Sequence, residues 1–291
     1  MQAIYEPRGA AREYAPLACN LYRGCVHGCK YCYSPATLRM SREEFHASSR
    51  LREGVIEALK REAPRYGGGA AHVLLCFTSD PYPPSPSWFA EATQDERLRG
   101  TSPPTGSEAT REALQILAAH DVPVEVLTKA GTRAARDFDV LARMRGRFAT
   151  TLLFTRDEDR ATWEPNAAPV EDRIDAIRDA HRRGIPTWVS VEPIIDPEQA
   201  LALIETLSDV VDEWRIGKLN HHPLAATIDW AAWAPRLLDA AQASGRRYMI
   251  KDALAAYLPP GRREQRFGGP EAACGHPSQA AAASLPLDAR G

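Results

Sequence analysis

Short β-branched segments alternate with longer amphipathic segments along most of this chain, and that alternation is the strongest constraint on its fold. The segments expected as strands are 72–78, 123–128, 148–154, 186–191, 213–216 and 248–251. The segments expected as helices are 48–63, 107–120, 133–145, 170–183, 197–207 and 229–244. Strand–helix alternation is typical of βαβ units, whose right-handed crossovers build a parallel sheet. The sequence therefore predicts an α/β fold, a full or partial barrel, with the C-terminal ends of its strands on one rim, where barrel chemistry sits.

Composition and charge narrow the class of protein. The chain has 291 residues, of which 44% are hydrophobic and 25% charged, enough for a full globular core. A formal net charge of −2 gives no overall attraction to nucleic acid or to an anionic membrane. No apolar run approaches the roughly 18 residues that a bilayer span requires, and the N-terminus lacks the apolar stretch of a signal peptide. We therefore expect a cytoplasmic protein without membrane attachment.

Four of the six cysteines are crowded into residues 19–32. Three of them, Cys25, Cys29 and Cys32, have the spacing C-x3-C-x2-C, and in a reducing compartment such crowding indicates metal or redox chemistry rather than disulfides. Three thiolates can hold a four-iron cluster, with one iron left open to chelate amino and carboxylate groups. The alternatives are incidental thiols or a zinc site, which would need Cys19 or His27 as a fourth ligand.

The residues around these cysteines resemble the signature of the radical S-adenosylmethionine (SAM) superfamily. Tyr31 precedes the last cysteine and Tyr33 follows it, and the stretch 20–33 is similar to the spore photoproduct lyase-like branch. The resemblance covers about residues 17–220. The further matching segments follow in the order of that branch: 78–82, 127–129, 163–165 and 171–174. The resemblance implies a partial (βα)6 barrel of the TIM type, with the cluster at its open rim.

The same resemblance implies a radical SAM enzyme whose cofactors are a [4Fe–4S] cluster, held by Cys25, Cys29 and Cys32, and SAM. In this family a reduced cluster passes one electron to SAM, which gives methionine and a 5′-deoxyadenosyl radical that abstracts hydrogen from a substrate. A reductant such as flavodoxin or ferredoxin is the implied partner. The substrate is left open, with nucleic acid as one possibility.

Four residues match SAM-binding positions of the branch. Tyr33 is expected against the adenine region and Ser79 near the methionine moiety. Lys129 matches a lysine that pairs with the SAM carboxylate through a charged hydrogen bond. Thr151 is the candidate for the ribose hydroxyl contact. Its competitors at the same strand end are Thr150 and Thr155.

Tyr31 and Cys76 are the candidate catalytic residues. Tyr31 and Tyr33 match the tyrosines that relay hydrogen in the photoproduct lyase, where a cysteine directly before Thr-Ser-Asp donates hydrogen. Here Phe77 has that place and Cys76 stands one residue earlier. Because side chains alternate faces along a strand, a shift by one residue reverses their direction. Unless a bulge corrects this shift, the pattern favours Cys76 as a buried structural thiol.

Two segments interrupt the alternation. Residues 81–107 are rich in Pro and Ser and form a long rim loop, expected as a substrate lid or partner-binding element. Residues 259–291 form a C-terminal extension to the barrel domain 1–258, expected to be poorly ordered. Arginines gather in the segment 133–147, but intervening acids favour a solvated helix face over a phosphate-binding one.

Two other functions compete with a radical SAM enzyme of unidentified substrate. The first is a DNA repair lyase acting on a thymine photoproduct, against which Phe77 and the lack of an obvious DNA-binding face argue. The second is a non-catalytic metal-binding interaction module, in which Lys129 and the rim motifs would have no task.

Overall fold

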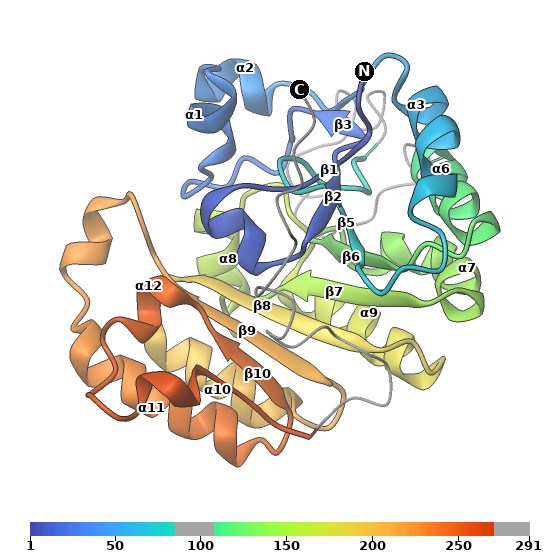
Figure 1. Ribbon diagram of the computed structural model, residues 1–291. Helices are drawn as coiled ribbons and strands as arrows, with labels where there is room; N and C mark the ends of the chain where they lie inside the picture. The colour runs from blue at the N-terminus through green and yellow to red at the C-terminus, as the bar shows by residue number, and fades with distance from the viewer. Residues whose placement is uncertain (85–107, 271–291) are drawn as a thin grey trace, which may run out of the picture.

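The computed structural model describes residues 1–84 and 108–270, and within them nine strands form one curved sheet (Figure 1). The strand order is β1-β2-β5-β6-β7-β8-β9-β10-β11. The strands are β1 (Ile4–Tyr5), β2 (Leu17–Cys19), β5 (Val73–Leu75), β6 (Val124–Thr128), β7 (Gly146–Thr151), β8 (Thr187–Ile194), β9 (Glu213–Lys218), β10 (Arg247–Ile250) and β11 (Phe267–Gly268). A separate pair is formed by β3 (Tyr22–Arg23) and β4 (Arg50–Leu51).

The central strands are parallel and only the edges are antiparallel. From β2 through β10 each neighbouring pair is parallel, whereas β1 and β11 pair antiparallel with β2 and β10. Since β1 and β11 end the strand order and do not pair with each other among the described strands, the sheet is open. The predicted α/β fold with a partial barrel is confirmed in this form, a curved and mostly parallel sheet.

Helices follow the strands and lie along the outer side of the sheet (Figure 1). The main helices are α3 (Val55–Glu62), α6 (Glu108–Ala119), α7 (Phe138–Arg143), α9 (Val170–Arg182), α10 (Pro197–Leu207) and α11 (Trp230–Ala243). Short α-helices are α1 (Ser34–Leu38), α2 (Arg42–His46), α8 (Asp157–Trp163) and α12 (Asp252–Ala255). The 3-10 helices are η1 (Gly9–Glu13), η2 (Ala63–Arg65), η3 (Gly131–Asp137), η4 (Pro223–Ala226) and η5 (Arg263–Arg266). None of the helices in the described parts of the chain has the length and hydropathy needed to cross a membrane.

Three local expectations were wrong. The helix expected over 48–63 begins only at Val55, because Arg50–Leu51 pair with Tyr22–Arg23 and Gly54 takes the left-handed φ of +69° before the helix. The segment 133–145 divides into η3 and α7 rather than one helix. The first parallel strand, β2, was not expected at all.

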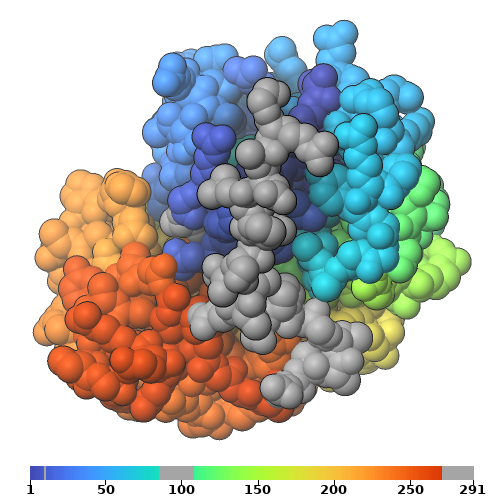
Figure 2. Space-filling view, viewed as in Figure 1, coloured from blue at the N-terminus to red at the C-terminus, as the bar shows by residue number. Residues whose placement is uncertain are grey.

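The two irregular segments are described only in part. Residues 85–107 of the rim loop lie outside the described residues. In the C-terminal extension, η5 and β11 are described, with β11 pairing with β10, whereas 271–291 lie outside. In the space-filling view, the N-terminal residues (blue) and the C-terminal helices (orange to red) flank the same face (Figure 2).

The inner face of the sheet is filled toward the N-terminal ends of the strands. A small apolar cluster consists of Ala15, Leu74, Ala149 and Trp188, with Tyr14, Phe77 and Leu127 packed against it. Next to it lies a buried ion network of Glu125, Arg147, Glu213 and Arg215. The Arg215 guanidinium stacks 3.6 Å from the Trp188 ring centroid and donates to the Tyr14 carbonyl at 2.8 Å. The ion network lies where these strands begin, whereas the chemistry of barrel folds sits at the opposite, C-terminal ends.

Candidate functional site

The loop that carries the cysteines follows β2 and is held by its backbone. Arg42 in α2 donates to the Cys29 carbonyl at 2.6 Å and to the Cys32 carbonyl at 3.0 Å. His46 of the same helix lies 2.8 Å from the Cys25 carbonyl through Nδ1. A Cβ on Gly24, whose φ is +79°, would meet the carbonyl oxygen of Ser48 at 2.1 Å and that of Phe45 in α2 at 2.9 Å, so the close approach of α2 and the residues after it requires glycine there. Sequence reasoning missed this role of α2, for which no sequence signal was available.

The three predicted cluster cysteines lie near one another in the loop. Burial, Asp80 and Cys29 raise the pKa of Cys25, and burial, against an opposing effect of Lys129, raises the pKa of Cys29 to about 12. Cys25, Cys29 and Cys32 act electrostatically on one another, which requires them to be close. Within the described chain, no three His, Cys, Asp or Glu side chains are arranged to hold one metal ion. A single zinc would need its sulfurs at about 2.3 Å from one point, whereas each thiolate of a four-iron cluster binds its own iron. The thiols therefore fit a cluster better than a single ion.

A buried polar chain connects the cysteine loop to α9. The hydroxyl of Tyr31 donates to Glu164 Oε1, and Glu164 Oε2 pairs with Arg173 Nη1 at 2.6 Å. Arg173 also donates to the Thr151 carbonyl at 2.9 Å. Burial alone would raise the pKa of Glu164, but Arg173 and Lys129 lower it, so this carboxylate is ionised. The candidate Tyr31 is thus hydrogen-bonded into the scaffold, and Glu164 and Arg173 belong to segments that the sequence had matched.

Lys129 lies directly after β6, beside the cysteine loop. Its Nζ is 5.8 Å from the centroid of the Tyr31 ring and has no hydrogen bond or ion pair within the described residues. Burial alone would lower the pKa of Lys129, but Cys29 and Glu164 raise it. The site therefore holds an ammonium group that is free to pair with an anionic ligand.

The three threonines expected as competitors for one contact differ in what their hydroxyls do. Thr150 donates to the Thr128 carbonyl at 2.8 Å, and Thr155 donates to Gln199 Oε1 at 3.2 Å. The hydroxyl of Thr151, at the end of β7, makes no hydrogen bond to any described residue. Thr151 is therefore the one of the three whose hydroxyl is available to a ligand.

Cys76 and Tyr33 both lie next to Phe77, Cys76 in the chain and Tyr33 through a hydrogen bond. Cys76 follows the end of β5 with a left-handed φ of +61°, so strand alternation no longer applies to it. Its thiol approaches the backbone of Leu21 and the Oγ of Ser79, and burial raises its pKa to about 12. Tyr33 is 47% exposed, and its hydroxyl donates to the Phe77 carbonyl at 3.4 Å.

A second polar group lies on the inner face at the ends of β8 and β10. The Tyr14 hydroxyl donates to Glu192 Oε2 and is 2.9 Å from Ser190 Oγ. Lys251 Nζ pairs with the same Glu192 oxygen at 3.0 Å. A Cβ on Gly217 would meet the Glu192 side chain at 2.5 Å, so this carboxylate lies directly over the β9 backbone. No local sequence pattern indicates the two partners of Glu192, which come from segments far away in the chain.

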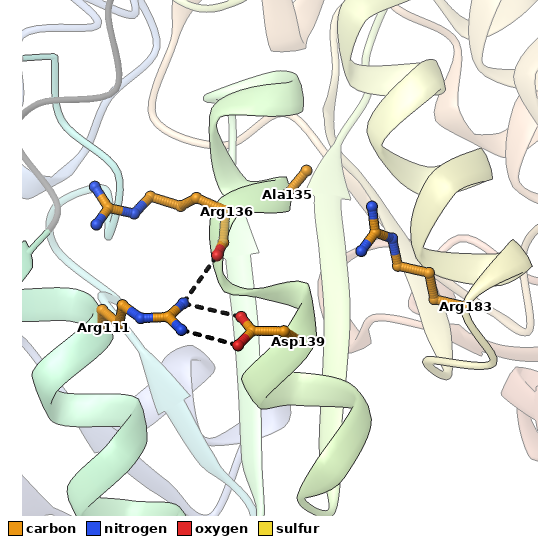
Figure 3. Close-up of a pocket in the computed structure, with 5 residues that line it drawn as sticks. All are labelled: Arg111, Ala135, Arg136, Asp139 and Arg183. Atoms are coloured by element: carbon orange, nitrogen blue, oxygen red, sulfur yellow. Dashed lines mark hydrogen bonds and ion pairs between the residues drawn. The ribbon is translucent and has the colours of Figure 1, made fainter.

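A shallow pocket of about 450 Å³ lies away from these groups, on the outer helical side (Figure 3). It is lined by Arg111, Ala135, Arg136, Asp139 and Arg183. Arg111 binds both carboxylate oxygens of Asp139, at 2.8 and 2.9 Å (Figure 3). Because an acid compensates the arginine here, the pocket is consistent with the solvated helix face expected from the sequence.

This chain is similar to a known protein family and to solved structures. The family model described as the Radical SAM superfamily matches residues 19–210. Among solved structures, spore photoproduct lyase complexed with dinucleoside spore photoproduct has a TM-score of 0.53 and 16% identity, covering 76% of this chain and 62% of that chain. A variant of that lyase with bound AdoMet and the same dinucleoside has a TM-score of 0.52, 16% identity and the same coverage. This chain therefore spans about 62% of the lyase's length, and at this identity the likeness concerns the fold. A search of curated proteins found no significant match.

Proposed function

This chain belongs to the radical SAM superfamily, and we propose that it cleaves SAM reductively with a [4Fe–4S] cluster held by Cys25, Cys29 and Cys32. The predicted family, the enzyme class and the two cofactors are confirmed at the level of the superfamily, whose members use this cluster and SAM. The observation that carries the proposal for this chain is the nearness of three thiols, one of which, Cys29, lies close to the Lys129 ammonium, a cation without a hydrogen bond or ion pair in the described structure.

The chain's own residues would bind and orient the cofactors. The chemistry that the bound cofactors supply is one-electron cleavage of SAM, which yields methionine and a 5′-deoxyadenosyl radical. The free ammonium of Lys129 would pair with the SAM carboxylate. The unpaired Thr151 hydroxyl would contact the ribose. Ser79 would lie near the methionine moiety and Tyr33, half exposed over the inner face, near the adenine.

The two candidate catalytic residues receive different roles. Tyr31 donates its hydroxyl hydrogen to the buried Glu164, which supports anchoring of the cysteine loop rather than hydrogen transfer. The burial of Cys76, which is 4% exposed, supports a structural thiol. Tyr33, whose hydroxyl donates to the Phe77 carbonyl at the long distance of 3.4 Å and which is 47% exposed, is then the better candidate for a hydrogen relay.

We propose a substrate other than a thymine photoproduct. The cysteine that would donate hydrogen in the lyase is replaced by Phe77, whose ring packs against Tyr14 at 5.6 Å. The substrate would approach the half of the rim that carries Glu192 and Lys251. Radical SAM enzymes need an external reductant, and a flavodoxin or ferredoxin is proposed for this one. We place the enzyme in the cytoplasm, where reducing conditions keep cluster thiols free.

The test is anaerobic reconstitution with iron and sulfide, followed by dithionite, SAM and chromatography for 5′-deoxyadenosine, with Cys29→Ala as control. We expect four irons per chain and 5′-deoxyadenosine from the wild type, and neither from the variant. Zinc bound in place of iron would overturn the proposal and favour a non-catalytic metal-binding module.

A further inference from the structure

We propose that Asp80 is a positioning residue that holds Lys129 and the cysteine loop in a fixed relation, so that the SAM carboxylate meets its lysine when SAM is bound at the cluster. This inference rests on the proposed function. Asp80 does not touch the reacting atoms in this role. It acts through the backbone that carries Lys129 and through His27, which lies between Cys25 and Cys29 in the sequence.

One buried carboxylate connects three segments of the chain. Oδ1 of Asp80 accepts from the Tyr82 backbone N–H at 2.8 Å and from the Thr128 hydroxyl at 2.7 Å. Oδ2 accepts from the Lys129 backbone N–H at 2.9 Å and lies 3.6 Å from Nδ1 of His27. These contacts join the turn after β5, the end of β6 and the cysteine loop.

The charge of Asp80 is compensated where it lies. Asp80 is 5% exposed, and a buried carboxylate is tolerated only when it is hydrogen-bonded or paired. Burial alone would raise the pKa of Asp80, but the hydrogen bonds that it accepts from Lys129, Tyr82 and Thr128 lower it. The group is therefore ionised at neutral pH and accepts hydrogen bonds through both oxygens.

The backbone contact is what gives Asp80 a functional role. The Lys129 ammonium has no hydrogen bond or ion pair among the described residues and only a distant contact with the Tyr31 ring, so its position depends mainly on where its backbone is held. A displacement of about 1 Å of a positioning group can cost about 100-fold in rate. By fixing the Lys129 N–H while facing His27, Asp80 sets the separation between the lysine and the cysteine loop.

The chain contains a matched control for the loss of such a carboxylate. Asp212 accepts from the Thr187 backbone N–H at 2.7 Å and from the Thr187 hydroxyl at 3.1 Å. This pair lies where β8 begins, at the opposite end of the strands from the cysteine loop. Asp212→Asn therefore removes the same kind of contacts as Asp80→Asn without touching the site.

The experiment compares Asp80→Asn, Asp212→Asn and the wild type after anaerobic reconstitution. Iron content and the electron paramagnetic resonance spectrum of the reduced cluster are recorded, and SAM is titrated against that spectrum. Because an amide nitrogen cannot accept a hydrogen bond, we expect Asp80→Asn to keep four irons but to weaken SAM binding about 10-fold or more. The KM for SAM in 5′-deoxyadenosine formation should rise in the same variant. The SAM affinity and the KM of Asp212→Asn should equal those of the wild type.

Thr128→Val keeps the test valid if Asp80→Asn does not fold. It removes one donor to Asp80 and leaves the carboxylate in place, so a smaller rise in the KM for SAM is expected. Thr187→Val, which removes a hydroxyl that donates to the Val210 carbonyl at 2.7 Å and to Asp212 at the start of β8, is its control. Unchanged SAM affinity in Asp80→Asn or in Thr128→Val would overturn the inference. A wild type without cluster or SAM cleavage would instead refute the proposed function, which separates the two failures.

Discussion

At the scale of single residues, Lys129 offers the most direct prediction. Lys129→Gln removes the free ammonium beside Cys29 while keeping most of the side chain's length. A hydrogen bond to a charged group contributes about 1.5–3 kcal/mol, so the KM for SAM should rise about 10- to 100-fold. The measurement is 5′-deoxyadenosine formation at varied SAM concentration. Lys60→Gln, which changes an exposed lysine paired with Glu57, should leave the KM unaltered.

Cys76 gives a prediction about reactivity. A thiol reacts as its thiolate, and burial raises the pKa of Cys76 to about 12. In native cluster-free protein at pH 8, iodoacetamide should therefore leave Cys76 unlabelled while it labels the partly exposed Cys32. Mass spectrometry of the digested protein reads out both sites. Rapid native labelling of Cys76 would show that the thiol reaches the site and would restore it as a hydrogen donor.

The sequence indicated those parts of the candidate site whose chemistry depends on residue type and spacing. It did not indicate the contacts that depend on the three-dimensional arrangement of distant segments. The spacing of Cys25, Cys29 and Cys32 limits the chemistry to a few metal centres. Asp80 stood inside a matched segment, yet its four contacts come from segments up to about fifty residues away and leave no local pattern. Arg42 binds carbonyl oxygens, which every residue has, so no sequence signal could identify its role.

At the scale of elements, length decided what could be predicted. The strand expected over 123–128 is observed as Val124–Thr128. The helix expected over 170–183 is observed as Val170–Arg182, because a long periodic segment carries a strong signal. The short helices α1 and α2 carry none. Helices of this length are not stable alone, and α2 is held by contacts such as the Cys25 N–H to the Phe45 carbonyl at 3.0 Å.

The chain from Tyr31 through Glu164 to Arg173 anchors one element to another, and Tyr31→Phe tests it. Removing the hydroxyl leaves the buried Glu164 Oε1 without this donor, which costs about 1–3 kcal/mol. We expect the cysteine loop to loosen and the cluster to be lost faster to an iron chelator, as followed by its visible absorbance. SAM cleavage should persist in freshly loaded protein.

Tyr248→Phe is the matched control for this variant. It removes another buried tyrosine hydroxyl, which donates to the Gln265 carbonyl at 3.0 Å, far along the chain from the cysteine loop. Equal rates of cluster loss in the two variants would show that the Tyr31 hydroxyl does not specifically stabilise the cysteine loop. Complete loss of SAM cleavage in loaded Tyr31→Phe would return Tyr31 to the catalytic residues.

At the scale of the whole molecule, the open sheet places its two kinds of polar group at opposite ends. The ion network of Glu125, Arg147, Glu213 and Arg215 fills the ends where the strands begin, and the cysteine loop covers the ends where they finish. The first group is fully paired and serves stability. The second includes the Lys129 ammonium and the Thr151 hydroxyl, neither of which is hydrogen-bonded to a described residue, as expected of groups that bind a ligand.

The ion network predicts how stability depends on pH. Burial alone would raise the pKa of Glu213, but Arg215 and Arg147 lower it below its usual range. A carboxyl whose pKa is lowered by folding stabilises the fold above its unfolded value of about 4.3, and that contribution is lost as the pH falls through the folded value. The free energy of unfolding should therefore decrease from pH 5 downward, as measured by urea titration of cluster-free protein.

Glu213→Gln separates the contribution of this network to the loss of stability in acid from that of the other carboxyls. Leaving Arg215 and Arg147 short of a buried partner should cost about 3–5 kcal/mol at pH 7. Because the variant has lost one of the titrating groups, its stability should fall less steeply between pH 5 and pH 3 than that of the wild type. Glu57→Gln, on an exposed pair with Lys60, should change neither quantity. If the free energy of unfolding of Glu213→Gln fell as steeply with pH as that of the wild type, other carboxyls would account for the acid sensitivity. The buried network would then make no measurable contribution to it.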